Sequence, residues 1–137
     1  MSRARVKLVE GLQFVGVADS GHAVVMDGTL SSGGRNTGST PMELLLMGIG
    51  GCSGMDVASI LRKKRQRLTG LEINVRGEKP DTYPKGFKDI ELEFIVKGKE
   101  IEEEAVKRAI ELSMEKYCSV KASLKAEVKW TYKIEEE

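Results

Sequence analysis

One segment, residues 42–61, constrains the fold more than any other part of the chain. Apolar side chains occur on every side of a helix drawn through it, which predicts a helix that is buried all round. Thr40 can cap this helix, Pro41 fits its first turn and Glu43 stands at its third position, the pattern of a capping box. The run is long enough to raise the question of a membrane span, but it contains Glu43 and Asp56 and is the only such run. We therefore expect a buried helix of a soluble protein.

Glycine is unusually frequent inside this helix, where each glycine is expected to cost about 1 kcal/mol relative to alanine. The four positions are Gly48, Gly50, Gly51 and Gly54. Close approach of another backbone would offset that cost, and a second copy of the same helix is the natural candidate. The helix should end near Arg65, because the basic run 62–67 suits the negative pole of a helix. The same basic run could instead contact phosphates.

The remaining chain carries short strand patterns and one further helix. Apolar-rich or alternating segments, which are typical of strands, cover residues 6–9, 13–18, 23–26, 71–76, 90–96 and 126–134. Apolar side chains at helical spacing cover residues 106–117, and the acidic run 102–104 favours the start of that helix. This order predicts an α+β fold in which helices cover an antiparallel sheet. We expect a single domain spanning residues 1–137.

Composition excludes several classes of protein. The chain has 137 residues, 40% of them hydrophobic and 31% charged, which is typical of a globular protein. A net charge of +1 argues against bulk attraction to nucleic acid or to a membrane. Two cysteines exclude a disulfide-rich scaffold and a four-ligand zinc site built from this chain alone. Charged residues are spread through the first ten positions, so we expect no secretory signal, a cytoplasmic location and reduced thiols at rest.

The two cysteines are the main candidates for chemistry. Cys52 lies within the central helix among glycines, and Cys118 follows the second helix. A thiolate can attack a peroxide, become a sulfenic acid and condense with a second thiol to form a disulfide. Free cysteines are also often small buried hydrophobes, and the spacing of these two does not decide between the readings. The small residues around Cys52 favour function, because they leave room for a substrate or a second sulfur.

A reactive Cys52 needs a nearby cation, since it lies too far along its helix to profit from the helix dipole. Arg35, on the glycine-rich loop before the helix, is the best candidate, although it could also be a solvated loop arginine. Glu43 precedes Cys52 by nine residues, roughly 13.5 Å along the helix axis. It could orient an arginine or only complete the cap, and the cap is the simpler explanation.

Two other motifs carry little functional signal. Residues 33–40 resemble a phosphate-binding loop, but Ser39 stands where that loop requires lysine, which argues against nucleotide binding. His22 is the only histidine, so a metal cluster built from several histidines cannot form from this chain alone. We expect no bound cofactor and no metal.

Three segments are distinctive: residues 40–44 with their spacing to Cys52, residues 117–120 around Cys118, and residues 124–128. In these segments, and over essentially its whole length, the chain resembles the OsmC/organic-hydroperoxide-resistance (Ohr) family. Within the family it is most similar to the YhfA-like subgroup. The resemblance implies an OsmC-like fold, an intertwined homodimer and two sites at the subunit interface.

The resemblance further implies thiol-dependent reduction of organic hydroperoxides in oxidative-stress defence. Cys52 would be the peroxidatic cysteine and Cys118 the resolving one, with an external dithiol as reductant. Two positions depart from the family pattern: Met42 occupies the place of a glutamate, with Glu43 next to it, and Arg35 is only a plausible substitute for the activating arginine. These departures support the alternative of a non-catalytic, redox-sensing or small-ligand-binding dimer.

Overall fold

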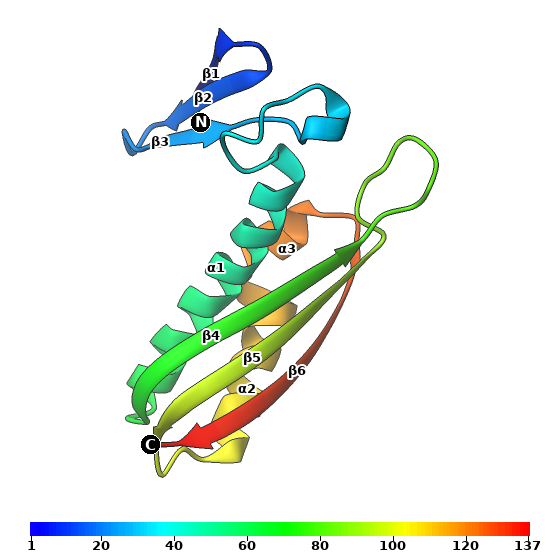
Figure 1. Ribbon diagram of the computed structural model, residues 1–137. Coiled ribbons are helices and arrows are strands. Elements are labelled where there is room, and N and C mark those ends of the chain that lie inside the picture. Colours follow the sequence, from blue (N-terminus) through cyan, green and yellow to red (C-terminus); the bar gives the residue numbers. More distant parts are fainter. The chain divides into compact units, whose positions relative to one another are not determined.

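The computed structural model describes residues 1–137, and the chain forms two compact units, residues 1–45 and 46–137 (Figure 1). We call them the N-terminal unit and the C-terminal unit. The expectation of a single domain stays a prediction.

The N-terminal unit contains a three-stranded antiparallel sheet in the order β1-β2-β3. Its strands are β1 (Ala4–Glu10), β2 (Gln13–Ala18) and β3 (Ala23–Met26). They coincide with the apolar-rich segments of the sequence, and the turns between them use Gly11 (φ 56°) and Gly21 (φ 84°). Every residue of β1 is exposed, so this sheet has no core of its own in the single chain.

One buried carboxylate organises the loop that follows β3. Asp27 accepts hydrogen bonds from the Thr37 hydroxyl and backbone N–H and from the Gly28 and Arg35 backbone N–H groups. The hydrogen bond from the Thr37 hydroxyl is the main cause that lowers the pKa of Asp27, and the backbone donors act in the same direction against the effect of burial. The loop therefore has a defined shape between β3 and the first long helix.

The long helix α1 spans Pro41–Lys63 and begins with the predicted capping box. The Thr40 N–H donates to Glu43 Oε1 (2.8 Å), and the Glu43 N–H donates to Thr40 Oγ1 (3.1 Å). By length and composition α1 could also cross a membrane, a test that core helices of soluble proteins pass as well. Within the C-terminal unit one face of α1 packs into the core.

The C-terminal unit places its helices on one face of a second three-stranded sheet (Figure 1). The strands are β4 (Arg67–Glu78), β5 (Asp89–Lys99) and β6 (Glu127–Glu136), and helix α2 spans Glu103–Leu112. The core lies between α1, α2 and the central strand β5. Its largest fully buried side chains are those of Phe94, Ile49, Leu61, Ile90, Leu92 and Ile110.

The α+β class is confirmed, but the prediction of a purely antiparallel sheet is wrong for the last strand. β4 and β5 pair antiparallel, whereas β5 and β6 pair parallel, from Asp89–Glu127 to Gly98–Glu136. The reason is the connection: α2 carries the chain back along the sheet before β6 begins, so β6 runs in the same direction as β5. The alternation of apolar and polar side chains along a strand does not reveal whether the strand pairs parallel or antiparallel with its neighbour.

The prediction that α1 is buried all round also fails in the single chain. Its buried residues are Ile49, Gly50, Ser53, Gly54, Val57 and Leu61, which lie on one side of the helix. Met47 and Met55 are 55% and 75% exposed. One face of α1 therefore belongs to the core, and the other remains an exposed apolar surface.

The glycines of α1 have two different surroundings. A Cβ on Gly50 would lie 2.9 Å from Val75 Cγ2, and a Cβ on Gly54 would lie 2.9 Å from Ile73 Cδ1. These two glycines therefore let α1 approach side chains of β4 in its own chain, not a second copy of the helix as we expected. Gly51 has no neighbour within 4 Å of a Cβ, so its position is open.

Candidate functional site

A cluster of two thiols and one carboxylate lies inside the C-terminal unit. The Sγ atoms of Cys52 and Cys118 and a carboxylate oxygen of Asp56 all lie within 4.8 Å of one another. Cys52 and Asp56 come from α1, four residues apart and therefore on the same face of the helix. The structure thus brings together two cysteines that are 66 positions apart in the sequence, and it adds an acidic group beside them.

An unusual turn delivers Cys118 to this cluster. A π-helical turn, Ser113–Tyr117, follows α2, and the Cys118 N–H donates to the Ser113 carbonyl (2.8 Å). Such turns are rare and often lie at functional sites. The short helix α3 (Ser119–Ser123) comes next, and Cys118 is its N-cap: the Lys121 N–H donates to Cys118 Sγ at 3.4 Å. The backbone on both sides therefore holds Cys118 in place.

The same turn holds the carboxylate of Asp56. The Ser113 hydroxyl donates to Asp56 Oδ2 at 2.8 Å, and the Ser113 side chain is fully buried. This bond links α1 to the turn after α2 across 57 positions of sequence. It uses one carboxylate oxygen and leaves the second free for another partner.

Burial raises the pKa of the Cys118 thiol. The hydrogen bond from Lys121 N–H acts in the opposite direction, while hydrogen bonding to Cys52 and the negative charges of Cys52 and Asp56 raise the Cys118 pKa further. No cation is among the groups that shift it. Cys118 is therefore a protonated thiol at neutral pH, and in that form it is a poor nucleophile.

The two thiols differ in their access to solvent. Cys52 is half-buried, whereas Cys118 is 5% exposed. Beside Cys52, Gly51 leaves open space where a side chain would otherwise stand. A small molecule from solvent can therefore reach Cys52 more easily than Cys118.

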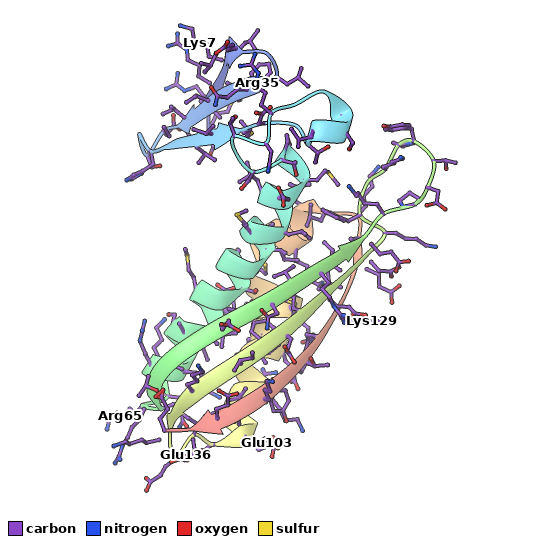
Figure 2. All side chains as sticks on the ribbon, viewed as in Figure 1. Lys7, Arg35, Arg65, Glu103, Lys129 and Glu136 are labelled. Carbon is purple, nitrogen blue, oxygen red and sulfur yellow. The ribbon has the colours of Figure 1, made fainter.

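The other two candidate residues lie in the N-terminal unit, outside this cluster of three. Arg35, labelled in Figure 2, lies over the β1–β2 turn at Gly11 and forms an exposed ion pair with Glu10 (3.2 Å). Glu43 is engaged in the capping box with Thr40. Their expected roles at the thiols stay predictions.

The cluster has only three groups that can bind a metal. A closed structural zinc site takes four ligands, and His22 lies at a turn, where its ring contacts the Ser20 hydroxyl (3.3 Å). Three protein ligands suffice for an open zinc site, so the expectation of no metal stays a prediction. Two sulfurs that can approach each other to about 2 Å also fit thiol redox chemistry.

Sequence reasoning missed two residues of this site, Asp56 and Ser113. Asp56 could have been found, because a residue four positions after Cys52 on a helix must share its face. Ser113 had no comparable signal, since its contact with Asp56 depends on how α1 packs against the turn after α2. Both residues looked like ordinary members of their helices.

Comparison with known proteins places the chain in a family. Residues 33–133, well over half of the chain, match the family model described as OsmC-like protein. The chain is 46% identical over 133 residues to protein YhfA of Escherichia coli K12, covering 97% of this chain and 96% of that protein.

Solved structures agree with this assignment. A crystal structure of a hypothetical protein from Aquifex aeolicus is 32% identical, with a TM-score of 0.87 over 100% of this chain and 98% of that chain. An organic hydroperoxide resistance protein from Elizabethkingia anophelis, crystallised with thiocyanate, has the same fold at 14% identity, with a TM-score of 0.71 over 100% of this chain and 96% of that chain. With the predicted cysteine segments and the α+β architecture, these matches show that the chain belongs to the OsmC-like protein family.

Proposed function

We propose that this protein reduces organic hydroperoxides through Cys52 and Cys118. The observation that carries the proposal is a pair of sulfurs within 4.8 Å of one another, of which one is half-buried and the other 5% exposed. The accessible sulfur suits the attack on peroxide, and the buried sulfur suits the resolving step. The relatives named for hydroperoxide resistance add support at the level of the fold.

The reaction has three steps that balance without a bound cofactor. The Cys52 thiol releases its proton, and the thiolate attacks the terminal oxygen of the hydroperoxide. The O–O bond breaks, the hydroxyl stays on sulfur as a sulfenic acid, and the alkoxide takes up the released proton and leaves as the alcohol. Cys118 then attacks the sulfenic sulfur, the S–O bond breaks, and water leaves as the disulfide forms. An external dithiol restores both thiols. The net reaction converts hydroperoxide and dithiol into alcohol, water and the oxidised dithiol. We propose that this activity serves oxidative-stress defence in the cytoplasm.

A homodimer forms part of this proposal. Two apolar surfaces are exposed in the single chain: the face of α1 that carries Met47 and Met55, and the sheet β1-β2-β3. A second copy of the chain can bury both. An obligate interface of this kind should bury about 2,000 Å² or more. Light scattering at low micromolar concentration should give twice the chain mass, and a stable folded monomer would contradict the dimer.

One observation favours a second candidate function, a redox-sensing or small-ligand-binding dimer without efficient turnover. The cluster contains the carboxylate of Asp56, and no cation is among the groups that shift the Cys118 pKa. The negative charge of Asp56 contributes to the raised pKa of the Cys118 thiol and so disfavours the thiolate that resolves the sulfenic acid. A sensor can tolerate slow oxidation, whereas a peroxidase requires fast oxidation.

A peroxidase assay separates the two candidates. Consumption of tert-butyl hydroperoxide and of hydrogen peroxide would be followed with dithiothreitol or a lipoyl dithiol as reductant. A peroxidase should turn over repeatedly and prefer the organic substrate, and Cys52→Ser should abolish rapid consumption. In Cys118→Ser the Cys52 sulfenic acid should be trapped by dimedone. If both variants and the unsubstituted protein react only at the rate of a free thiol, the peroxidase proposal is wrong.

A further inference from the structure

The proposed reaction leaves one chemical problem at Cys118. A resolving cysteine must attack as a thiolate, yet burial keeps this sulfur protonated and no cation favours its ionisation. Some group must therefore take its proton during the resolving step. The ionisable groups that affect Cys118 are Cys52, which is by then a sulfenic acid, and Asp56.

We propose that Asp56 is the general base of the resolving step: it accepts the proton of the Cys118 thiol as this sulfur attacks the Cys52 sulfenic acid, and it delivers that proton to the departing hydroxyl. This inference rests on the proposed peroxidase function and adds a residue to its site. Geometry carries it, because a carboxylate oxygen lies within 4.8 Å of both sulfurs. The two proton-transfer partners, the Cys118 thiol and the hydroxyl on Cys52, thus share one neighbouring carboxylate.

The position of Asp56 is set by two independent features of the fold. It follows Cys52 by one turn of α1, so that both side chains leave the same face of the helix. The Ser113 hydroxyl holds Oδ2 at 2.8 Å, which fixes the orientation of the carboxylate and leaves one oxygen for the proton. Since Ser113 and Cys118 belong to the same π-helical turn and its end, base and nucleophile are held by one local structure. Ser113 is accordingly a positioning residue.

The step balances without an outside acid or base. The S–H bond of Cys118 and the S–O bond of Cys52 break, and an S–S bond and an O–H bond of water form. The proton moves from Cys118 to Asp56 and then to the leaving hydroxyl, so the carboxylate returns to its initial state. The electron pair of the S–O bond leaves with the oxygen, and no further oxidant or reductant is needed.

A purely structural role for Asp56 predicts a different outcome. If the carboxylate only binds Ser113 and joins α1 to the turn, its removal should lower stability and affect both chemical steps. A general base affects the second step alone and changes that step's pH dependence. The titratable groups that shift the pKa of Cys118 are Cys52 and Asp56 from α1, and Lys121 contributes its backbone N–H. Deprotonation of the Cys118 thiol therefore dominates the pH profile once the carboxylate is lost.

The test is a single-turnover experiment on Asp56→Asn in the presence of a chelator. Reduced protein is mixed with tert-butyl hydroperoxide and quenched at intervals, and sulfenic acid and disulfide are quantified by mass spectrometry after trapping with dimedone. Sulfenic acid should form as fast as in the unsubstituted protein, because Asp56 takes no part in the attack of Cys52 on the hydroperoxide. Disulfide formation should slow by about 100-fold, the lower end of general-base contributions.

The pH dependence provides a second readout. In Asp56→Asn, disulfide formation should accelerate by about tenfold per pH unit, following the thiolate fraction of Cys118, whereas the unsubstituted protein should be nearly insensitive around neutral pH. Asp56→Glu, which retains a carboxylate, should recover part of the rate, and Ser113→Ala should show a smaller loss than Asp56→Asn. If Asp56→Asn folds poorly, Asp56→Glu and Ser113→Ala still test the role of the carboxylate.

Matched controls separate this proposal from the function on which it rests. In the Cys118→Ser background, Asp56→Asn should not slow sulfenic acid formation. An equal loss in both steps, or disulfide formation in Asp56→Asn that is as fast and as pH-insensitive as in the unsubstituted protein, would overturn the role of Asp56. Absence of sulfenic acid in every variant, including the unsubstituted protein, would overturn the peroxidase proposal itself.

Discussion

The two sheets of this protein have the same number of strands and opposite surroundings. All seven residues of β1 are exposed, while β5 carries the fully buried side chains of Ile90, Phe94 and Val96. The apolar pattern of the sequence is similar in both regions. The difference shows that an apolar strand pattern predicts only that one face of the sheet will be buried, and not which part of the protein will bury it. In the C-terminal unit the helices of the same chain supply it, whereas the sheet of the N-terminal unit remains open in the single chain.

The largest test of this comparison is a pair of matched truncations. Phe94→Ala in β5 should lower the free energy of unfolding by about 3–5 kcal/mol, because it removes a buried aromatic side chain and leaves a cavity. Val6 in β1 is 56% exposed in the single chain, so Val6→Ala would cost about 0.5 kcal/mol or less if the sheet stayed uncovered; the proposed dimer, which covers the sheet, predicts a larger loss. Urea denaturation followed by circular dichroism measures both. A large loss in Val6→Ala would mean that the first sheet is covered in solution, as the proposed dimer requires.

A smaller contrast is expected between the two faces of α1. Gly50→Ala should lower stability by about 1 kcal/mol, because the overpacking cost of about 1–3 kcal/mol exceeds the gain in helix propensity. The new methyl group would meet Val75, a β-branched side chain that is stiff at χ1.

Gly51→Ala is the matched variant on the face that is open in the single chain. It would raise stability by about 1 kcal/mol through helix propensity alone if that face stayed uncovered, whereas the proposed dimer predicts no gain or a loss. Thermal unfolding of the two variants, in parallel with the unsubstituted protein, gives the comparison. A loss of stability in Gly51→Ala would show that a second copy packs against this face.

The loop of the N-terminal unit should respond to acid through Asp27. Its pKa is lowered in the folded protein, chiefly by the Thr37 hydroxyl, so its ionised form stabilises the fold above the unfolded-state value of 3.8. That contribution is lost as the pH falls through the lower, folded-state value. Asp27→Asn should therefore reduce the melting temperature at neutral pH and converge with the unsubstituted protein well below pH 4. A constant difference at all pH values would mean that charge is not involved.

The smallest expected change in stability concerns Arg35. Its ion pair with Glu10 is exposed, so Arg35→Ala should alter the free energy of unfolding by about 0.5 kcal/mol or less. If Arg35 assists Cys52, the same substitution should slow alkylation of Cys52 by iodoacetamide without abolishing it. Arg5→Ala, on the neighbouring strand β1, is the matched control for lost positive charge. Equal alkylation rates in all three proteins would remove Arg35 from the site.

Local patterns in the sequence predicted much of this fold. The strands of both units and the start of α1 were predictable because their signals are short-range: alternation, helical spacing and the Thr40–Glu43 capping box. The direction of β6 was not predictable from its alternation, because a strand reads alike in parallel and antiparallel pairs. The glycines of α1 were recognised as sites of close approach, but the partner of Gly50 and Gly54 is β4 of the same chain.

The candidate site divides in the same way. The sequence by itself determined that Cys52 and Asp56 share a helical face, since four residues complete about one turn. Only the tertiary structure decided that Cys118 and Ser113 meet that face, because their positions depend on the packing of α1 against the π-helical turn after α2. Burial decided the rest: the same packing that excludes water from Cys118 raises the pKa of its thiol. Side-chain chemistry is encoded residue by residue, whereas proximity and desolvation arise only when distant segments pack together.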